Sequence, residues 1–88
     1  MPKYVVERDI SRFTATALIQ AGRRSVRALK TMHGRVQWVQ SYVTQGKLYS
    51  IYIAPSEREI HRHAKASRLP CTTVRKVVAM ADPSLFGA

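Results

Sequence analysis

The stretch VQWVQSYVTQGKLYSIYI, residues 36–53, carries the clearest structural pattern in this 88-residue chain. Residues 36–43 and 48–53 both alternate with a period of two, which is typical of β-strands. Between them, Gln45-Gly46 supplies the two-residue turn that joins antiparallel strands. The stretch therefore predicts a β-hairpin.

This turn also predicts the register and the two faces of the hairpin. The expected opposite pairs are Tyr42 with Tyr49, Gln40 with Ile51, and Trp38 with Ile53. One face is then expected to carry Trp38, Gln40, Tyr42, Tyr49, Ile51 and Ile53. The other is expected to carry Val39, Ser41, Val43, Leu48, Ser50 and Tyr52. Because both faces are largely apolar, we expect helices to cover one and the sheet of a second subunit to cover the other.

The residues on either side of the hairpin predict two helices and two further strands. Residues 3–8 are β-rich, and residues 14–32 place apolar or small side chains at helical spacing before Gly34. After Ala54-Pro55, Ser56 and Glu59 form the pattern of a capping box that starts a second helix, which Leu69-Pro70 ends. Residues 74–80 then predict a fourth strand.

The expected order is β-α-β-β-α-β, with a hairpin between the middle strands and one helix in each crossover. We therefore predict an α+β, ferredoxin-like fold with a four-stranded antiparallel sheet and two helices on one face. Residues 1–83 are expected to form a single domain and residues 84–88 a short C-terminal tail. A chain this small has a modest core, which favours a homodimer.

The chain is strongly basic, with 15 Lys and Arg against five Asp and Glu and a net charge of +10. Weak binding of nucleic acid or another polyanion is expected at low salt. Arg23, Arg27 and Lys30 recur at helical spacing, either as a solvated helix face or as an anion-binding face. No recognisable nucleic-acid motif accompanies the charge.

Nothing in the sequence indicates a membrane segment or a signal peptide, so a cytoplasmic protein is expected. Cys71 is the only cysteine and is interpreted as an ordinary or half-buried thiol. With five acids and no supported Ser-His-Asp or Cys-His order, the chain is expected to bind rather than catalyse.

Two of the three histidines lie in the segment IHRHA, residues 60–64. On a helix, residues two positions apart point about 200° away from each other. His61 and His63 therefore cannot close on one ion. His33, beside Gly34, is explained as a cation near a helix C-terminus.

Four pieces of the sequence, in order, resemble one family: Tyr4-Val5-Val6-Glu7-Arg8, Trp38 with Ser41-Tyr42-Val43, Tyr52 with Ala54-Pro55-Ser56, and His63-Ala64. They are similar to small bacterial nickel-binding proteins of ferredoxin-like fold, formerly a domain of unknown function. The resemblance spans about residues 2–83. It implies a sheet-to-sheet dimer, that is, a dimeric α/β barrel.

The resemblance also implies a binding function, for nickel or another divalent transition metal, with His63 as the matching ligand. In the family, the middle strands usually read W-x-H-S-Y-V and Y-E-A-P. This chain has Gln40 and Ile53 at the places of that histidine and glutamate. These two replacements make metal binding a weaker prediction. The predicted binding function also allows a small ligand instead of a metal, in a cleft near the second helix.

Two alternatives stay open. Polyanion binding would use the basic face of the first helix. A small oxygenase or isomerase of the same fold would use Trp38, Gln40, Tyr42 and Tyr49, which could instead be a pocket wall or dimer face.

Overall fold

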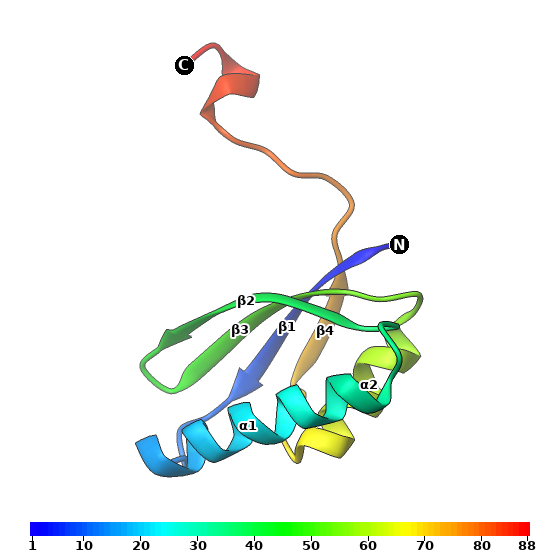
Figure 1. The fold of residues 1–88 in the computed structure, drawn as a ribbon. Helices are drawn as coiled ribbons and strands as arrows, with labels where there is room; N and C mark the ends of the chain where they lie inside the picture. Colours follow the sequence, from blue (N-terminus) through cyan, green and yellow to red (C-terminus); the bar gives the residue numbers. More distant parts are fainter.

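The computed structural model describes residues 1–88 of the chain. The elements are β1 (Lys3–Asp9), α1 (Ala15–Thr31), β2 (Gln37–Thr44), β3 (Lys47–Ile53), α2 (Glu57–Ser67), β4 (Thr73–Lys76) and a short 3-10 helix, η1 (Pro83–Phe86). The four strands form one antiparallel sheet in the order β2-β3-β1-β4. Both helices lie on the same side of it (Figure 1). The predicted βαββαβ ferredoxin-like fold is confirmed.

Helix α1 starts and stops where the sequence predicts. The hydroxyl of Thr14 accepts a hydrogen bond from the backbone N–H of Ala17 at 3.0 Å, which caps the N-terminus. After the helix, His33 and Gly34 have φ values of 52° and 76°, in the left-handed region that ends helices. Small side chains of α1, among them Ala21 and Ser25, are buried, and the helix packs closely on α2.

Helix α2 follows Ser56 as expected, but the predicted capping box is wrong. The Ser56 side chain makes no capping hydrogen bond. The Glu59 carboxylate turns to cations instead, with Oε1 at 3.3 Å from Arg62 Nη1 and 3.5 Å from Arg35 Nη2. Charge attraction to two guanidinium groups replaces the bond to the Ser56 amide. The helix ends at Arg68, which has a φ of 55°.

The hairpin follows the predicted register near its turn and departs from it at Val39. Gln40 pairs with Ile51 and Tyr42 with Tyr49, as predicted. A β-bulge lies between Trp38 and Gln40, so Trp38 pairs with Tyr52 rather than Ile53. A bulge inserts one extra residue and reverses the facing of everything beyond it. Trp38 therefore lies on the helix side of the sheet, and the predicted face for this residue is wrong.

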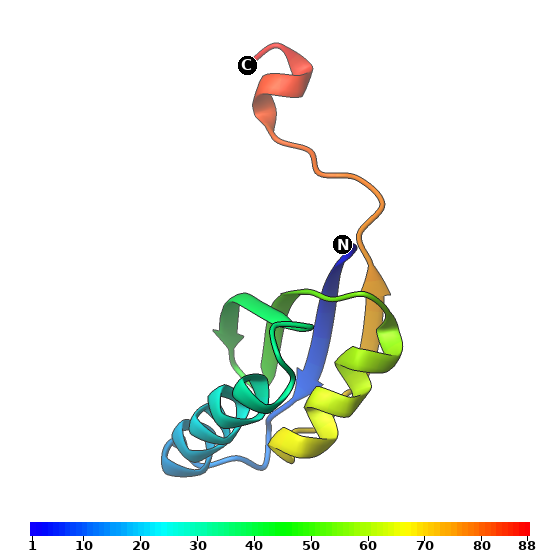
Figure 2. The ribbon, with the colours of Figure 1, turned by 45° about the vertical axis from the view of Figure 1, so that its right-hand side comes forward.

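The two faces of the sheet have different environments (Figure 2). Side chains on the helix side form a core of Tyr4, Val6, Val36, Tyr52, Ala54 and Ile60. No helix covers the opposite side, which we call the open face. From the strand registers, its central residues are Val5, Gln40, Tyr42, Tyr49, Ile51 and Ile53. The centre of this face is largely apolar, whereas Lys3, Glu7, Lys47 and Arg75 lie toward its margins.

Strand β4 is shorter than predicted, because it ends at Lys76 instead of residue 80. One further backbone bond joins Val77 N to Lys3 O at 2.8 Å. Lys3 is the first residue of β1, so residues after Val77 have no strand beside which to continue. Residues 78–88, the C-terminal arm, leave the sheet and stand clear of the rest of the chain (Figures 1 and 2).

None of the helices combines the length and the hydropathy required to cross a lipid bilayer.

Candidate functional site

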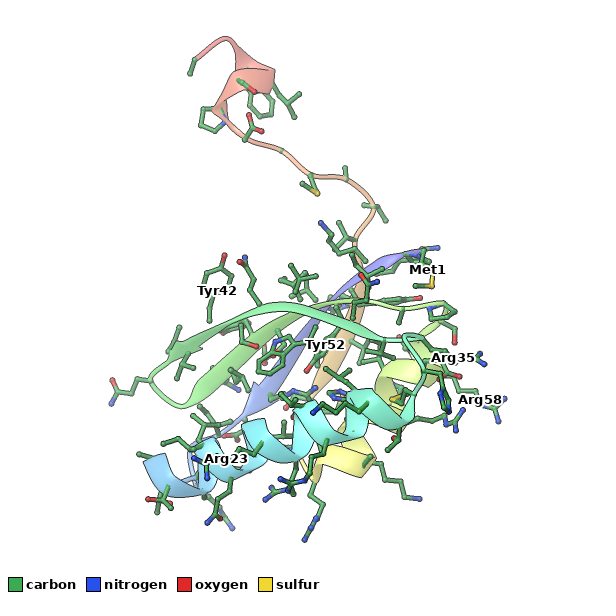
Figure 3. All side chains as sticks on the ribbon, viewed as in Figure 1. Met1, Arg23, Arg35, Tyr42, Tyr52 and Arg58 are labelled. Carbon is green, nitrogen blue, oxygen red and sulfur yellow. The ribbon has the colours of Figure 1, made fainter.

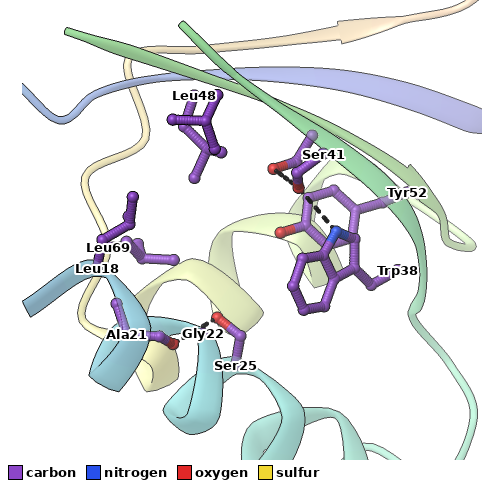
Figure 4. Close-up of a pocket in the computed structure, with 11 residues that line it drawn as sticks. Leu18, Ala21, Gly22, Ser25, Trp38, Ser41, Leu48, Tyr52 and Leu69 are labelled. Carbon is purple, nitrogen blue, oxygen red and sulfur yellow. Dashed lines mark hydrogen bonds between the residues drawn. The ribbon is translucent and has the colours of Figure 1, made fainter. Parts of the chain in front are cut away.

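A pocket of about 130 Å³ lies between α1 and the β2–β3 hairpin; we call it the hairpin pocket (Figure 4). It is lined by Leu18, Ala21, Gly22, Ser25, Trp38, Ser41, Val43, Leu48, Ser50, Tyr52 and Leu69. Seven of these residues are hydrophobic, and none has a carboxylate, amine, imidazole or thiol. The wall is suited to an apolar molecule.

Hydrogen bonds within the protein already pair the polar groups of this wall. The indole N–H of Trp38 donates to Ser41 Oγ at 2.8 Å, and the Ser41 and Ser50 hydroxyls are 2.7 Å apart. Across the pocket, Ser25 Oγ donates to the carbonyl of Ala21 at 2.9 Å, so it bonds to its own helix. With these partners in place, contact with an apolar surface leaves few polar atoms unpaired.

Of the four residues predicted as a pocket wall or dimer face, the structure brings only Trp38 to the pocket. Gln40, Tyr42 and Tyr49 lie on the open face, where the Gln40 amide donates to the Tyr42 hydroxyl. Figure 3 shows Tyr42 directed away from the helices and Tyr52 directed toward them. The predicted group is divided between two sides of the sheet.

Arg8 is completely buried behind the pocket, with no carboxylate partner. Its Nη1 donates to the carbonyl of Pro70 at 2.8 Å, and its Nη2 donates to Tyr52 Oη at 3.1 Å. The Nε–H has no partner. These bonds hold the phenol of Tyr52, one of the pocket-lining residues, and tie β1 to the segment after α2.

His63 is also completely buried, in contact with Tyr52 at a ring-centroid distance of 5.3 Å. Its Nε2 lies 3.2 Å from the Ser25 carbonyl and 3.3 Å from Ser67 Oγ. Because a carbonyl only accepts, Nε2 carries the hydrogen, and Nδ1 is left as a buried, unpaired acceptor. Burial lowers the pKa of His63 below its usual 6.5, and the positive charge of Arg8 lowers it further. The hydrogen bond to the Ser25 carbonyl acts in the opposite direction. His63 is therefore a neutral core residue.

The other two histidines are remote from the core. His61 is exposed, with Nε2 at 3.6 Å from Glu57 Oε2 one turn earlier on α2. His33 is exposed in the turn after α1. Neither lies beside His63 in the interior.

The residues present do not fit a nickel site. No group of three or more His, Cys, Asp or Glu side chains is placed to hold a metal ion. His63, the predicted ligand, is enclosed in the core. Gln40 and Ile53 lie on the open face, where Gln40 offers a neutral amide and Ile53 offers no atom that can bind a metal. Burial raises the pKa of the Cys71 thiol above its usual 9.0, which disfavours the thiolate that binds metals.

The fold brings together only two of the three residues of the predicted basic face of α1, Arg23 and Arg27. A shallow hollow is lined by Gln20, Arg23, Arg24, Arg27 and Arg68, and Lys30 does not take part. The Nε–H of Arg24 donates to the Ser67 carbonyl at 2.9 Å, which orients its guanidinium at the end of α2. No carboxylate pairs with these arginines. We call this group the arginine hollow.

Sequence reasoning missed Arg8 and Arg68. Arg8 alternates with buried Tyr4 and Val6, so its position on a core-facing row was a signal. Arg68 gave no local signal, because it meets Arg24 and Arg27 only through the packing of α2 on α1.

Comparisons with known proteins agree with this fold. The profile of the family described as nickel responsive protein SCO4226-like matches residues 4–77. The crystal structure of SCO4226 from Streptomyces coelicolor A3(2) is similar with a TM-score of 0.76 at 17% identity, covering 90% of this chain and 99% of that one. A search of curated proteins found no match. The chain belongs to the SCO4226-like family of nickel-responsive proteins.

Proposed function

We propose that this protein is a non-catalytic binding protein that takes a compact, mainly apolar molecule into the hairpin pocket. The observation that carries this proposal is an apolar cavity of about 130 Å³ whose hydroxyl groups are already paired. For scale, an engineered apolar cavity of about 150 Å³ binds benzene. The matching ligand class is a single-ring molecule with at most one polar group.

The composition of the wall supports binding rather than catalysis. General acid–base chemistry needs a titratable side chain within hydrogen-bond reach of the substrate. The only titratable side chain on the pocket wall is Tyr52, whose hydroxyl accepts a bond from Arg8. His63 lies behind Tyr52 and is enclosed. An oxygenase or isomerase reaction therefore has no evident proton donor or acceptor at this pocket.

Binding can be measured through Trp38, the only tryptophan, because it lies on the wall of the pocket. Titration with phenol and toluene should shift its fluorescence in a saturable way. Gly22 lines the pocket, and a Cβ added there meets nothing within 4 Å. Gly22→Leu should fill the space and abolish the response, whereas Gly22→Ala should retain it. A response equal in both variants, or none in the parent chain, rejects the proposal.

We also propose that a second copy covers the open face. The support is a central group of half-buried apolar side chains on adjacent strands, with Val5 opposite Ile51 and with Tyr49 and Ile53 on either side of Ile51. Burying such a surface is favourable by roughly 25 cal/mol per Å². A sheet of the same composition from a second chain supplies a matching apolar surface.

A second candidate function is the binding of phosphate-bearing polyanions at the arginine hollow. The observation that favours it is the meeting of four arginines from two helices with no carboxylate partner. Arginine presents several N–H donors in a planar fork that matches phosphate oxygens. The guanidinium of Arg24 is already held by its hydrogen bond to the Ser67 carbonyl, so one of the four arginines is preorganised for phosphate binding.

This second function can be separated from general charge attraction by paired variants. Arg27→Glu with Arg68→Glu should lower retention of RNA or heparin and reduce its salt dependence. Lys30→Glu with Arg58→Glu changes the net charge equally but leaves the hollow intact, so it serves as the control. Equal losses in the two double variants would mean that only net charge matters.

A further inference from the structure

The C-terminal arm carries apolar side chains that contact little of its own chain. Val78, Met80, Leu85 and Phe86 are 94%, 71%, 63% and 79% exposed. The only side-chain bond between the arm and the body joins Lys3 Nζ to Met80 Sδ at 3.5 Å. A run of exposed large hydrophobic residues usually marks a surface that is covered in the working molecule.

Strand β2 is the second surface of this kind. It is eight residues long, lies at the edge of the sheet and has no charged residue or proline. Val39, Tyr42 and Val43 on this strand are all exposed. Proteins normally protect a long apolar edge strand with charges, proline or a covering segment, because its free N–H and C=O groups recruit other chains. Within its own chain β2 has no charge, proline or covering segment, and the bulge at Val39 is its one interruption.

The fold places these two surfaces at opposite edges. The arm continues from β4, whereas β2 is the far strand in the order β2-β3-β1-β4. The arm also leaves past the end of the sheet rather than folding back over it (Figures 1 and 2). A second copy could bring its own β2 to the arm of the first.

Charge also favours contact between the arm and a body of this composition. All 15 Lys and Arg lie at or before Lys76, and the sole charged side chain of the arm is Asp82. An acidic, apolar segment is thus attached to a strongly basic domain. Two basic bodies repel each other, and an arm free of cations can cross between them at lower electrostatic cost.

The arm belongs to this chain rather than to the matched part of the family. The family profile matches residues 4–77 and stops where the arm begins. Its 11 residues could span roughly 36 Å when extended, which exceeds the width of a four-stranded sheet at about 4.8 Å per strand spacing.

We propose that the C-terminal arm of each copy lies along β2 of a second copy, with Leu85 and Phe86 packed on the exposed side chains of that strand. The arrangement rests on the proposed homodimer. It is reciprocal, so a two-fold axis buries both arms and both β2 edges. Because Leu85 and Phe86 belong to η1, they contact β2 through their side chains, and the extended residues 78–82 are the part of the arm that can add to the open sheet edge, as in strand-addition recognition.

The first test compares the full chain with a chain truncated after Val77 by sedimentation over a range of concentrations. Truncation should raise the dimer dissociation constant at least tenfold, about 1.4 kcal/mol. Leu85→Ser with Phe86→Ser should act in the same direction, and Ser84→Ala should leave the constant unchanged. Circular dichroism should show the same fold for all four chains, since the arm contributes little to it.

The second test identifies the contact. A photoreactive side chain introduced by Phe86→p-benzoylphenylalanine, in protein mixed with an isotope-labelled copy, should crosslink to residues 37–44 of the other chain. A dimer that survives truncation unchanged, or crosslinks confined to one chain, overturns the arm contact alone. A full chain that stays monomeric at every concentration overturns both the dimer and the arm contact.

Discussion

The indole of Trp38 donates a hydrogen bond to the hydroxyl of Ser41 at 2.8 Å, across the bulge at Val39. In a regular strand, residues three apart face opposite sides of the sheet. The bulge therefore makes this bond possible. Ser41→Ala removes this bond and the bond between the Ser41 and Ser50 hydroxyls, so it should cost about 1–3 kcal/mol of unfolding free energy, at about 0.5–1.5 kcal/mol per hydrogen bond. Urea unfolding followed by Trp38 fluorescence measures it, and an unchanged midpoint would show that water replaces these bonds.

The glycines of the α1 region should respond to alanine in opposite directions. Gly22 lies inside the helix with open space around an added Cβ, so Gly22→Ala should stabilise the protein by about 0.5–1 kcal/mol. Gly34 has a φ of 76° after the helix, so Gly34→Ala should destabilise it by about 1–2 kcal/mol. Thermal unfolding of the two variants beside the parent chain checks both signs. A loss of stability in Gly22→Ala would contradict the packing at this helix.

His63 should make the stability depend on pH in the acidic range. The pKa of His63 is lower in the folded chain than in the unfolded chain. Below about pH 6.5 the unfolded chain therefore binds a proton at this residue, whereas the folded chain keeps it neutral. Stability should therefore be fully present above that pH and fall as the pH drops below it. His63→Gln should flatten this part of the curve. Urea midpoints between pH 8 and pH 5 provide the measurement.

Arg8 should be coupled to His63, because its positive charge contributes to the lowered pKa. Arg8→Met keeps most of the buried volume and removes the charge, so the pKa of His63 should rise. NMR titration of the His63 ring follows the pKa directly. Arg58→Met, an exposed arginine in the first turn of α2, is the control and should leave that pKa unchanged. A pKa unaffected by Arg8→Met would show that burial alone sets it.

The open face should lose its ability to join two copies when a charge is placed at its centre. Ile51 lies between Val5 and Gln40, so Ile51→Glu would place a carboxylate in the proposed interface, at a cost of several kcal/mol. Sedimentation should show a monomer, while Ile51→Val should remain a dimer. A dimeric Ile51→Glu protein would place the interface elsewhere.

Nickel should bind this chain poorly and bind a reconstructed pair of ligands better. Gln40 and Ile53 lie diagonally on one face of the hairpin, close enough for long side chains to approach. Gln40→His with Ile53→Glu should produce saturable heat in a nickel titration, and Gln40→His alone should give less. Equally tight binding by the parent chain would mean that it uses other ligands.

The sequence by itself determined the elements and their order, because strand alternation, helical spacing and end signals depend on neighbouring residues. Gln45-Gly46 set the register next to the turn, and Thr14 and Gly34 marked the limits of α1. Family membership also followed from short matching pieces of sequence. The sequence contains one weak indication of the bulge at Val39. Gln37 and Gln40 are both polar, but residues three positions apart face opposite sides of a regular strand.

Tertiary structure decided which residues form a site. Trp38 joined the hairpin pocket only because the bulge carried it to the helix side, and Arg68 joined the arginine hollow only when α2 packed on α1. His63 kept its helical position, but the sheet and α1 enclosed it and removed it as a ligand. Periodicity reports which way a side chain points along its own element. Burial and partners depend on distant segments, which meet only in the folded chain.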